Sequence, residues 1–126
     1  LTEYPFSLTL RSSEDIDCAW RAVQRGRQLR YVPDARVEHS HDYDWTALWK
    51  RVQSEGDSAA QIFGTVPGCF GSLVRAAMET LRDFAFLAVH PRGWREIPAA
   101  PIRRLIQKLA FRRGGLAAFA RKQAKP

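Results

Sequence analysis

Cysteine and long apolar runs are both scarce in this chain of 126 residues. The two cysteines, Cys18 and Cys69, lie far apart and in no metal-ligand pattern, which excludes a disulfide framework and fits a reducing compartment. No run of about 18 uninterrupted apolar residues occurs, so we expect no membrane-spanning helix. We also expect no secretory leader, because the first residues lack the order of basic and then apolar side chains. These absences predict a cytoplasmic protein, and a chain that starts at Leu1 is expected to be a piece of a longer one.

Acidic residues are almost missing from residue 92 onward, and the net charge of +7 belongs to that region. Residues 1–91 hold ten Lys and Arg against twelve Asp and Glu, whereas residues 92–126 hold ten Lys and Arg against Glu96 alone. A basic tail of this kind is a solvated helix face, a nucleic-acid contact or an attraction to anionic lipid. No helix-turn-helix, zinc-finger or RNA-binding signature is present, so we expect no nucleic-acid partner.

Apolar residues recur at helical spacing in four parts of the chain, and with 45% hydrophobic residues a packed core is expected. The predicted helices are residues 14–25, a helix from residue 45 that Gly56 weakens or ends, a second helical stretch at residues 58–63, residues 73–89, and residues 102–111 with a break at Gly114-Gly115. Hydroxyls of Ser12 and Ser13 are expected to cap the first helix and Gly26 to end it, while Asp44 caps the second. The apolar face of the second helix is expected to pack against a sheet through Trp45, Leu48, Trp49 and Val52.

Two short segments, residues 29–32 and 36–39, have the composition of strands and flank a turn at Pro33-Asp34. Two strands are too few for an independent sheet, so we expect them to be edge strands of a sheet whose other strands lie outside this chain. The predicted fold class is therefore α+β and mostly helical, with a helix, two short edge strands and then helices. We expect residues 1–64 and 65–126 to form two parts, of which the second is a helical, basic extension.

The densest cluster of candidate functional residues combines the acids of residues 14–17 with His39 and His41. Carboxylates at a helix N-terminus lie beside the positive end of the helix dipole, so they stay ionised and can act as bases or metal ligands. The alternative is ordinary helix capping, which is the commoner role of such a pattern. In an extended segment both imidazoles share one face, which suits a divalent metal, although two histidines alone are a weak pattern. Spacing alone leaves these interpretations open.

A longer pattern joins the same residues. The string Glu14-Asp-Ile-Asp-Cys-Ala-Trp-Arg21 is followed by Arg25-Gly26 and by Leu29-Arg-Tyr-Val-Pro-Asp-Ala-Arg-Val-Glu-His39-Ser-His41. In order and spacing this pattern resembles the family 2 glycosyltransferases, which carry an acidic start, an Arg in the same helix, a Gly stop, a strand ending in Val-Pro and a closing His. The similarity continues more loosely to Gly56, and the basic tail is similar to the tails of rhamnosyltransferase-like members.

The resemblance implies the acceptor-side half of a GT-A fold and an inverting transfer of a sugar from a nucleotide-sugar donor in a single displacement. Asp15 would be the general base that takes the proton from the acceptor hydroxyl. Glu14 and Asp17 would hold the acceptor or orient the helix. Arg21 would support them by pairing with Asp17, which lies one turn earlier in the same helix.

The resemblance also implies a divalent metal, Mn²⁺ or Mg²⁺, which neutralises the leaving diphosphate. His39 would complete the site of this metal, whereas His41 is a second ligand, an acceptor contact or a surface residue. The acceptor would be a lipid-linked or cell-envelope glycan. The nucleotide-binding, Rossmann-like half of the family has no counterpart in this chain, so we expect the isolated chain to be inactive.

The predicted tail helix alternates apolar side chains with cations. The cations expected at a membrane surface are Arg103, Arg104, Lys108, Arg112 and Arg113. Such a helix can lie in a bilayer interface, here as a peripheral contact with an anionic membrane at the inner face of the plasma membrane, and an ordinary surface helix is an equal alternative. For the whole chain, the alternative to a transferase is a non-catalytic helical module that docks on a membrane or a partner through the Trp45 and Trp49 helix and the tail.

Overall fold

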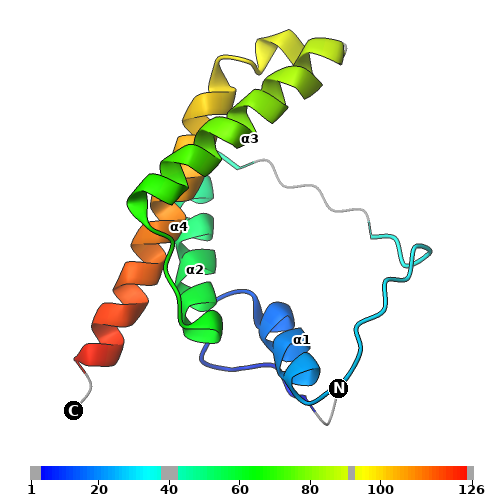
Figure 1. Ribbon diagram of the computed structural model, residues 1–126, viewed down its shortest axis with the longest axis vertical. Coiled ribbons are helices and arrows are strands. Elements are labelled where there is room, and N and C mark those ends of the chain that lie inside the picture. The colour runs from blue at the N-terminus through cyan, green and yellow to red at the C-terminus, as the bar shows by residue number, and fades with distance from the viewer. Residues whose placement is uncertain (1–3, 38–42, 91–92, 125–126) are drawn as a thin grey trace.

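The computed structural model describes residues 4–37, 43–90 and 93–124 of the chain. Within these ranges it consists of four α-helices and one short 3-10 turn, and it contains no strand. The elements are α1 (Glu14–Gln24), α2 (Trp45–Phe63), α3 (Cys69–Val89), the turn η1 (Gly93–Arg95) and α4 (Ala99–Gln123). The long helix α4 is central: α2 crosses its carboxy-terminal part, α3 lies along its amino-terminal part, and α1 stands beside the end of α2 (Figure 1).

Local signals in the sequence place the start of α2 and the end of α1 correctly. α2 begins after Asp44, whose carboxylate accepts a hydrogen bond from the N–H of Ala47 at 2.7 Å, as expected of an N-cap. α1 ends before Gly26, whose φ of 76° is the left-handed geometry that ends many helices. The predicted hydroxyl cap of α1 is wrong, because Ser13 occupies the N-cap position but its side chain makes no cap hydrogen bond.

The two predicted strands do not form in the described part of the chain. Residues 27–37 are all exposed and contain no strand, although the expected turn at Pro33-Asp34 is present and is closed by a hydrogen bond from the Ala35 N–H to the Val32 carbonyl. A strand needs a neighbour that satisfies its backbone N–H and C=O groups, and no described segment supplies one. The prediction of an α+β fold with edge strands is therefore wrong for the described residues, which are all-helical.

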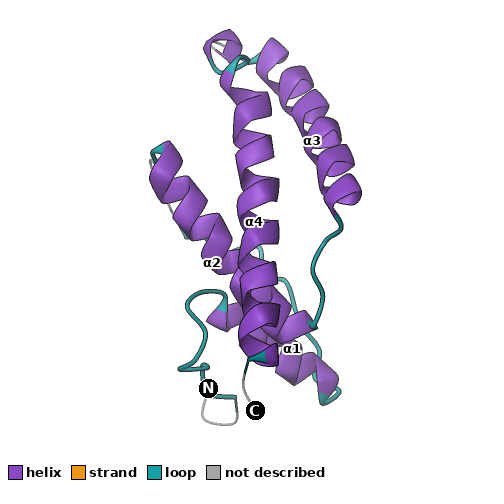
Figure 2. Cartoon of the chain, turned by 90° about the vertical axis from the view of Figure 1, so that its left-hand side faces the viewer, coloured by secondary structure: helices purple, strands orange, loops and turns teal. Residues whose placement is uncertain are grey.

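Helices α2 and α4 cross at a direct contact between their backbones (Figure 2). A Cβ added at Gly56 would overlap the carbonyl oxygen of Phe111, and one added at Gly114 would overlap the carbonyl oxygen of Gln53. Both glycines are buried. Because glycine has no Cβ, the two backbones can approach until they touch.

The predictions that a helix ends at Gly56 and that Gly114-Gly115 breaks another are wrong, whereas the weakening of α2 by Gly56 stays a prediction. α2 runs through Gly56 to Phe63, and α4 runs through both glycines to Gln123. A glycine inside a helix costs about 1 kcal/mol relative to alanine, and the packing at the crossing offsets this cost. The apolar residues buried on α2 and α4 are small or β-branched: Val52, Ala60, Ala100, Ala110 and Ala118.

The core is small, and much of the chain is uncovered. The accessible surface is 10093 Å², whereas a compact monomer of 126 residues exposes about 6,800 Å². The expected packing of the second helix is only partly seen, since Val52 is buried whereas Trp45 is exposed. Among the described residues, no helix is both long and apolar enough to cross a membrane.

The predicted division after residue 64 falls in the loop between α2 and α3. The main contact within the described chain nevertheless joins α2, from the first predicted part, to α4, from the second. The division into residues 1–64 and 65–126 stays a prediction.

Replacement of Gly56 or Gly114 by alanine is expected to lower the free energy of unfolding by about 3 kcal/mol, because the new Cβ forces α2 and α4 apart. Gly71 is the matched control, since it also lies inside a helix but an added Cβ there has no atom within 4 Å. Gly71→Ala should be neutral or stabilising by up to about 1 kcal/mol. Urea unfolding followed by circular dichroism measures all three changes. Equal stability of Gly114→Ala and Gly71→Ala would contradict the backbone contact.

Candidate functional site

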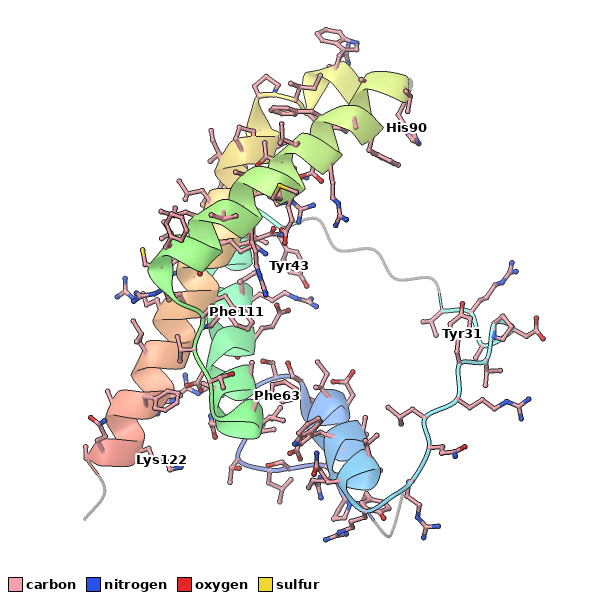
Figure 3. The ribbon with its side chains drawn as sticks, in the orientation of Figure 1. Tyr31, Tyr43, Phe63, His90, Phe111 and Lys122 are labelled. Carbon is pink, nitrogen blue, oxygen red and sulfur yellow. The ribbon has the colours of Figure 1, made fainter. Side chains whose placement is uncertain are left out.

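A cleft of about 1040 Å³ lies between the start of α1 and one flank of α2. It is lined by acids, cations and apolar side chains together. The charged ones are Arg11, Glu14, Asp15, Arg51 and Glu55, and the large apolar ones are Ile16, Ile62, Phe63 and Phe111. Figure 3 labels Phe63 on α2 and Phe111 on α4, which belong to the apolar lining.

Asp15, the predicted general base, belongs to the first turn of α1 and lines this cleft. Its side chain is exposed, as is that of Glu14. An accessible carboxylate can take a proton from a hydroxyl that comes within about 3 Å. The geometry is therefore suitable for a base, and the catalytic role of Asp15 stays a prediction.

A few side-chain contacts connect α1, and the residues just before it, to α2. The Ser54 hydroxyl donates a hydrogen bond to the Ser12 hydroxyl at 3.2 Å, and the hydroxyls of Ser12 and Ser58 lie 3.3 Å apart. Ser58 is fully buried. Trp20 packs edge-on against Phe63, with ring centroids 5.2 Å apart. From the sequence, Ser12 is predicted to be a helix cap. Its partners on α2 lie more than forty residues away in the chain, so no local pattern indicates these contacts.

The ion pair expected between Arg21 and Asp17 is present, with the guanidinium 2.8 Å from the carboxylate. Arg21 also donates a hydrogen bond to the Pro5 carbonyl at 2.6 Å, which ties the segment before α1 to the helix. Neither residue lines the cleft, whereas Glu14 does. Roles for Glu14, Asp17 and Arg21 in holding the acceptor stay predictions.

The cleft contains a cation to which the sequence assigned no role. Arg51 forms an ion pair with Glu55 at 2.9 Å and also donates a hydrogen bond to the Tyr43 hydroxyl. The hydrogen bond to Glu55, with a smaller contribution from Tyr43, raises the pKa of Arg51 above its ordinary value, so the guanidinium stays charged. The i, i+4 spacing of Arg51 and Glu55 indicates the pair, but no local pattern places it opposite the first turn of α1.

His39 and His41, the predicted metal ligands, lie outside the described residues. Within the described ranges, no group of three or more His, Cys, Asp and Glu side chains is arranged to hold a metal ion. Of the carboxylates in the cleft, that of Glu55 is engaged by Arg51. A divalent metal therefore does not fit the described residues of the cleft, and a requirement for Mn²⁺ or Mg²⁺ stays a prediction.

Two of the cations predicted at a membrane surface join α4 to α3 through ion pairs. Arg104 donates to both carboxylate oxygens of Asp83 at 2.7 Å and reaches Glu79 at 3.3 Å. Lys108 binds the other oxygen of Glu79 at 2.6 Å. The hydrogen bonds from Arg104 hold the pKa of Asp83 below its ordinary value, and those to Asp83 raise the pKa of Arg104.

The other three predicted cations have different surroundings. Arg103 pairs with Glu96 at 3.2 Å, and Arg113 lies over the ring of Trp49, 6.0 Å from its centroid. The Nε of Arg112 is buried and has no hydrogen-bond partner among the described residues. A membrane-surface role for these cations stays a prediction, and the ion pairs show that Arg103, Arg104 and Lys108 also have partners within the protein.

Asp83→Asn is expected to lower the free energy of unfolding by about 1 kcal/mol at neutral pH, because it removes charged hydrogen bonds that are partly exposed to solvent. The folded-state pKa of Asp83 lies below the unfolded value of about 3.9. The stabilisation is therefore complete above that pH and is lost as the pH falls through the folded pKa. Urea unfolding of both proteins at neutral and acid pH should show their difference in stability shrinking below about pH 4.

Asp34→Asn provides the control for this measurement. It removes the same charge from an exposed turn, where no described residue forms an ion pair with the carboxylate. A difference between wild type and Asp83→Asn that stays constant on acidification, or one that Asp34→Asn reproduces, would contradict the stabilising role of the Asp83 pair.

Part of the chain is similar to a glycosyltransferase. The similar proteins are the pre-mycofactocin glycosyltransferases of two strains of Mycobacterium tuberculosis, each 42% identical over 60 residues. The matched segment is 45% of this chain and 12% of each relative, so the chain spans only a small part of the length of the curated relatives that it matches. No protein-family model and no solved structure matches the chain. The similarity supports a relation of this part of the chain to glycosyltransferases.

Proposed function

We propose that this chain supplies the general base and part of the acceptor site of an inverting glycosyltransferase that uses a nucleotide-sugar donor. The observation that carries the proposal is the position of Asp15, exposed at the helix start that lines the cleft. The similarity to a glycosyltransferase over 60 residues supports the same reaction class. We infer further that the enzyme belongs to family 2, is rhamnosyltransferase-like, and acts on a lipid-linked or cell-envelope glycan.

In the proposed reaction, an acceptor hydroxyl lies in the cleft within about 3 Å of the Asp15 carboxylate. Its oxygen forms a bond to the anomeric carbon of the donor sugar while the bond from that carbon to the diphosphate oxygen breaks. The hydroxyl proton passes to Asp15, and the nucleoside diphosphate leaves with the bonding electrons. Because attack and departure occur on opposite faces of the sugar, the anomeric configuration is inverted.

The described residues of the cleft support this chemistry in separate ways. The Ser12 contacts with α2 keep the first turn of α1 in place, and precise placement is a large part of what a general base needs. Arg11 also lines the cleft, and its guanidinium is suited to bind a phosphate group of the donor. Phe63 and Phe111 supply an apolar wall of the kind on which sugar rings rest.

The proposal is tested by Asp15→Asn in a longer protein that contains this chain and transfers sugar. Transfer should fall by about 100- to 10,000-fold in kcat, while the affinity for the nucleotide-sugar donor stays unchanged, because the asparagine keeps the shape but cannot take the proton. Asp44→Asn is the matched control, since Asp44 does not line the cleft and asparagine is an equally good N-cap. Transfer by Asp15→Asn at the rate of Asp44→Asn would remove Asp15 from the role of base.

The second candidate function is a non-catalytic docking module. It is favoured by one observation, the large apolar side chains that α3 and α4 leave in solvent. The two candidates make different predictions for the same measurement, because a docking module predicts no effect of Asp15→Asn on any reaction of the longer protein.

A further inference from the structure

Helix α3 carries a continuous apolar stripe that nothing in the described chain covers. Ser72, Ala76 and Thr80 are buried on one side of the helix. On another side the exposed fraction reaches 80% for Phe70 and 62% for Leu81. The further exposed apolar residues of this helix are Leu73, Val74, Met78, Phe86 and Val89. Soluble monomers rarely leave so much contiguous apolar surface in water without a partner.

Helix α4 has an exposed apolar stripe of its own. Ile102, Leu105, Leu109 and Leu116 are all exposed, and three of them follow one another at seven-residue intervals. Two helical turns separate residues that are seven apart, so these side chains line one face of α4. This face is different from the one that meets α2, which contains Phe111 and Gly114.

The ion pairs between the helices determine how the two stripes lie. Glu79 binds Lys108 and Asp83 binds Arg104, so α3 and α4 run antiparallel with these edges facing each other. Successive residues of a helix are about 100° apart around its axis. On α3, Phe70 and Leu81 therefore lie on the side opposite to the buried Ser72 and Ala76 and to the paired acids, so the stripe of α3 faces away from α4. The stripe of α4 also lies away from the edge that carries Arg104, so the two stripes are separate surfaces. Figures 1 and 2 show the hairpin of α3 and α4 extending beyond the rest of the chain.

The net charge of the α3–α4 hairpin indicates which kind of partner its exposed apolar surface can bind. The described hairpin residues, 69–90 and 93–124, hold ten Lys and Arg against three acids. Each of these acids, Glu79, Asp83 and Glu96, is already bound by a cation of α4. The hairpin therefore presents an apolar face within a positive field, and a negatively charged surface with an apolar interior complements both properties.

We propose that the exposed apolar stripe of α3 docks in the interface of an anionic lipid bilayer, with this helix lying parallel to the membrane plane. No described helix is apolar enough to span the membrane, and an interfacial helix buries its apolar side only about 5–10 Å deep. A second copy of the chain fits this face less well, because pairing would bring two hairpins of like charge together. The proposal is independent of the sugar-transfer reaction.

The test uses the 126-residue chain and vesicles of phosphatidylglycerol and phosphatidylcholine in equal parts, with pure phosphatidylcholine vesicles for comparison. The wild-type chain should co-sediment with the anionic vesicles, more weakly with the neutral ones, and less well as salt is added. The double variant Phe70→Gln/Leu81→Gln should bind the anionic vesicles about tenfold or more weakly, since two large side chains no longer enter the apolar layer.

Leu8→Gln is the matched control, because Leu8 is 100% exposed and lies outside the hairpin, so its loss should leave vesicle binding unchanged. Circular dichroism should show the same helix content for all variants, since each replaced side chain is exposed. Three results would overturn the proposal: no binding of wild type to anionic vesicles, equal binding by the double variant, or a wild-type dimer in ultracentrifugation that the double variant abolishes without any vesicle binding. The Asp15→Asn measurement does not bear on these results, so failure of one proposal is distinguishable from failure of the other.

Discussion

The contact of Gly56 and Gly114 with the backbone of the opposite helix is the constraint on which the rest of the structure depends. α1 is attached to α2 through the Ser12 hydroxyl and through Trp20, and α3 is attached to α4 through the Asp83 and Glu79 ion pairs. The crossing of α2 and α4 is the main link between these two halves. Any change that moves the crossing point therefore moves the α1 cleft relative to the hairpin. Small buried residues make such a crossing close and specific, but they bury little apolar surface, which is consistent with the small core.

The sequence predicted the helices well where the signal was local. The Asp44 cap and the Gly26 stop depend on residues within one helical turn, and both are where the spacing indicated. The prediction that glycines end the helices failed because a preference of about 1 kcal/mol is outweighed when another backbone packs against the glycine. The strand predicted at residues 29–32, and the described part of the one predicted at residues 36–39, failed to form for a related reason. Their composition suits a strand, but a strand exists only with a partner, and the described chain provides none.

The residues of the candidate site also differ in whether a local sequence pattern predicts their position. The acids at the start of α1 are a local pattern, and the structure has them at a cleft. Arg51 on the opposite wall comes from α2, and nothing in its own surroundings in the sequence indicates that it faces α1. For the tail cations, a local pattern is present but does not indicate the contacts that these side chains make. As a local pattern Arg104 and Lys108 indicated a lipid-facing surface, yet their nearest partners are Glu79 and Asp83, more than twenty residues earlier in the chain. Only the antiparallel packing of α3 on α4 brings those charges together.

Neutralisation of these acids changes the character of the hairpin. A carboxylate left free on the hairpin would be repelled by anionic lipid. Bound to Arg104 and Lys108, the acids instead stabilise the hairpin and leave its net charge positive.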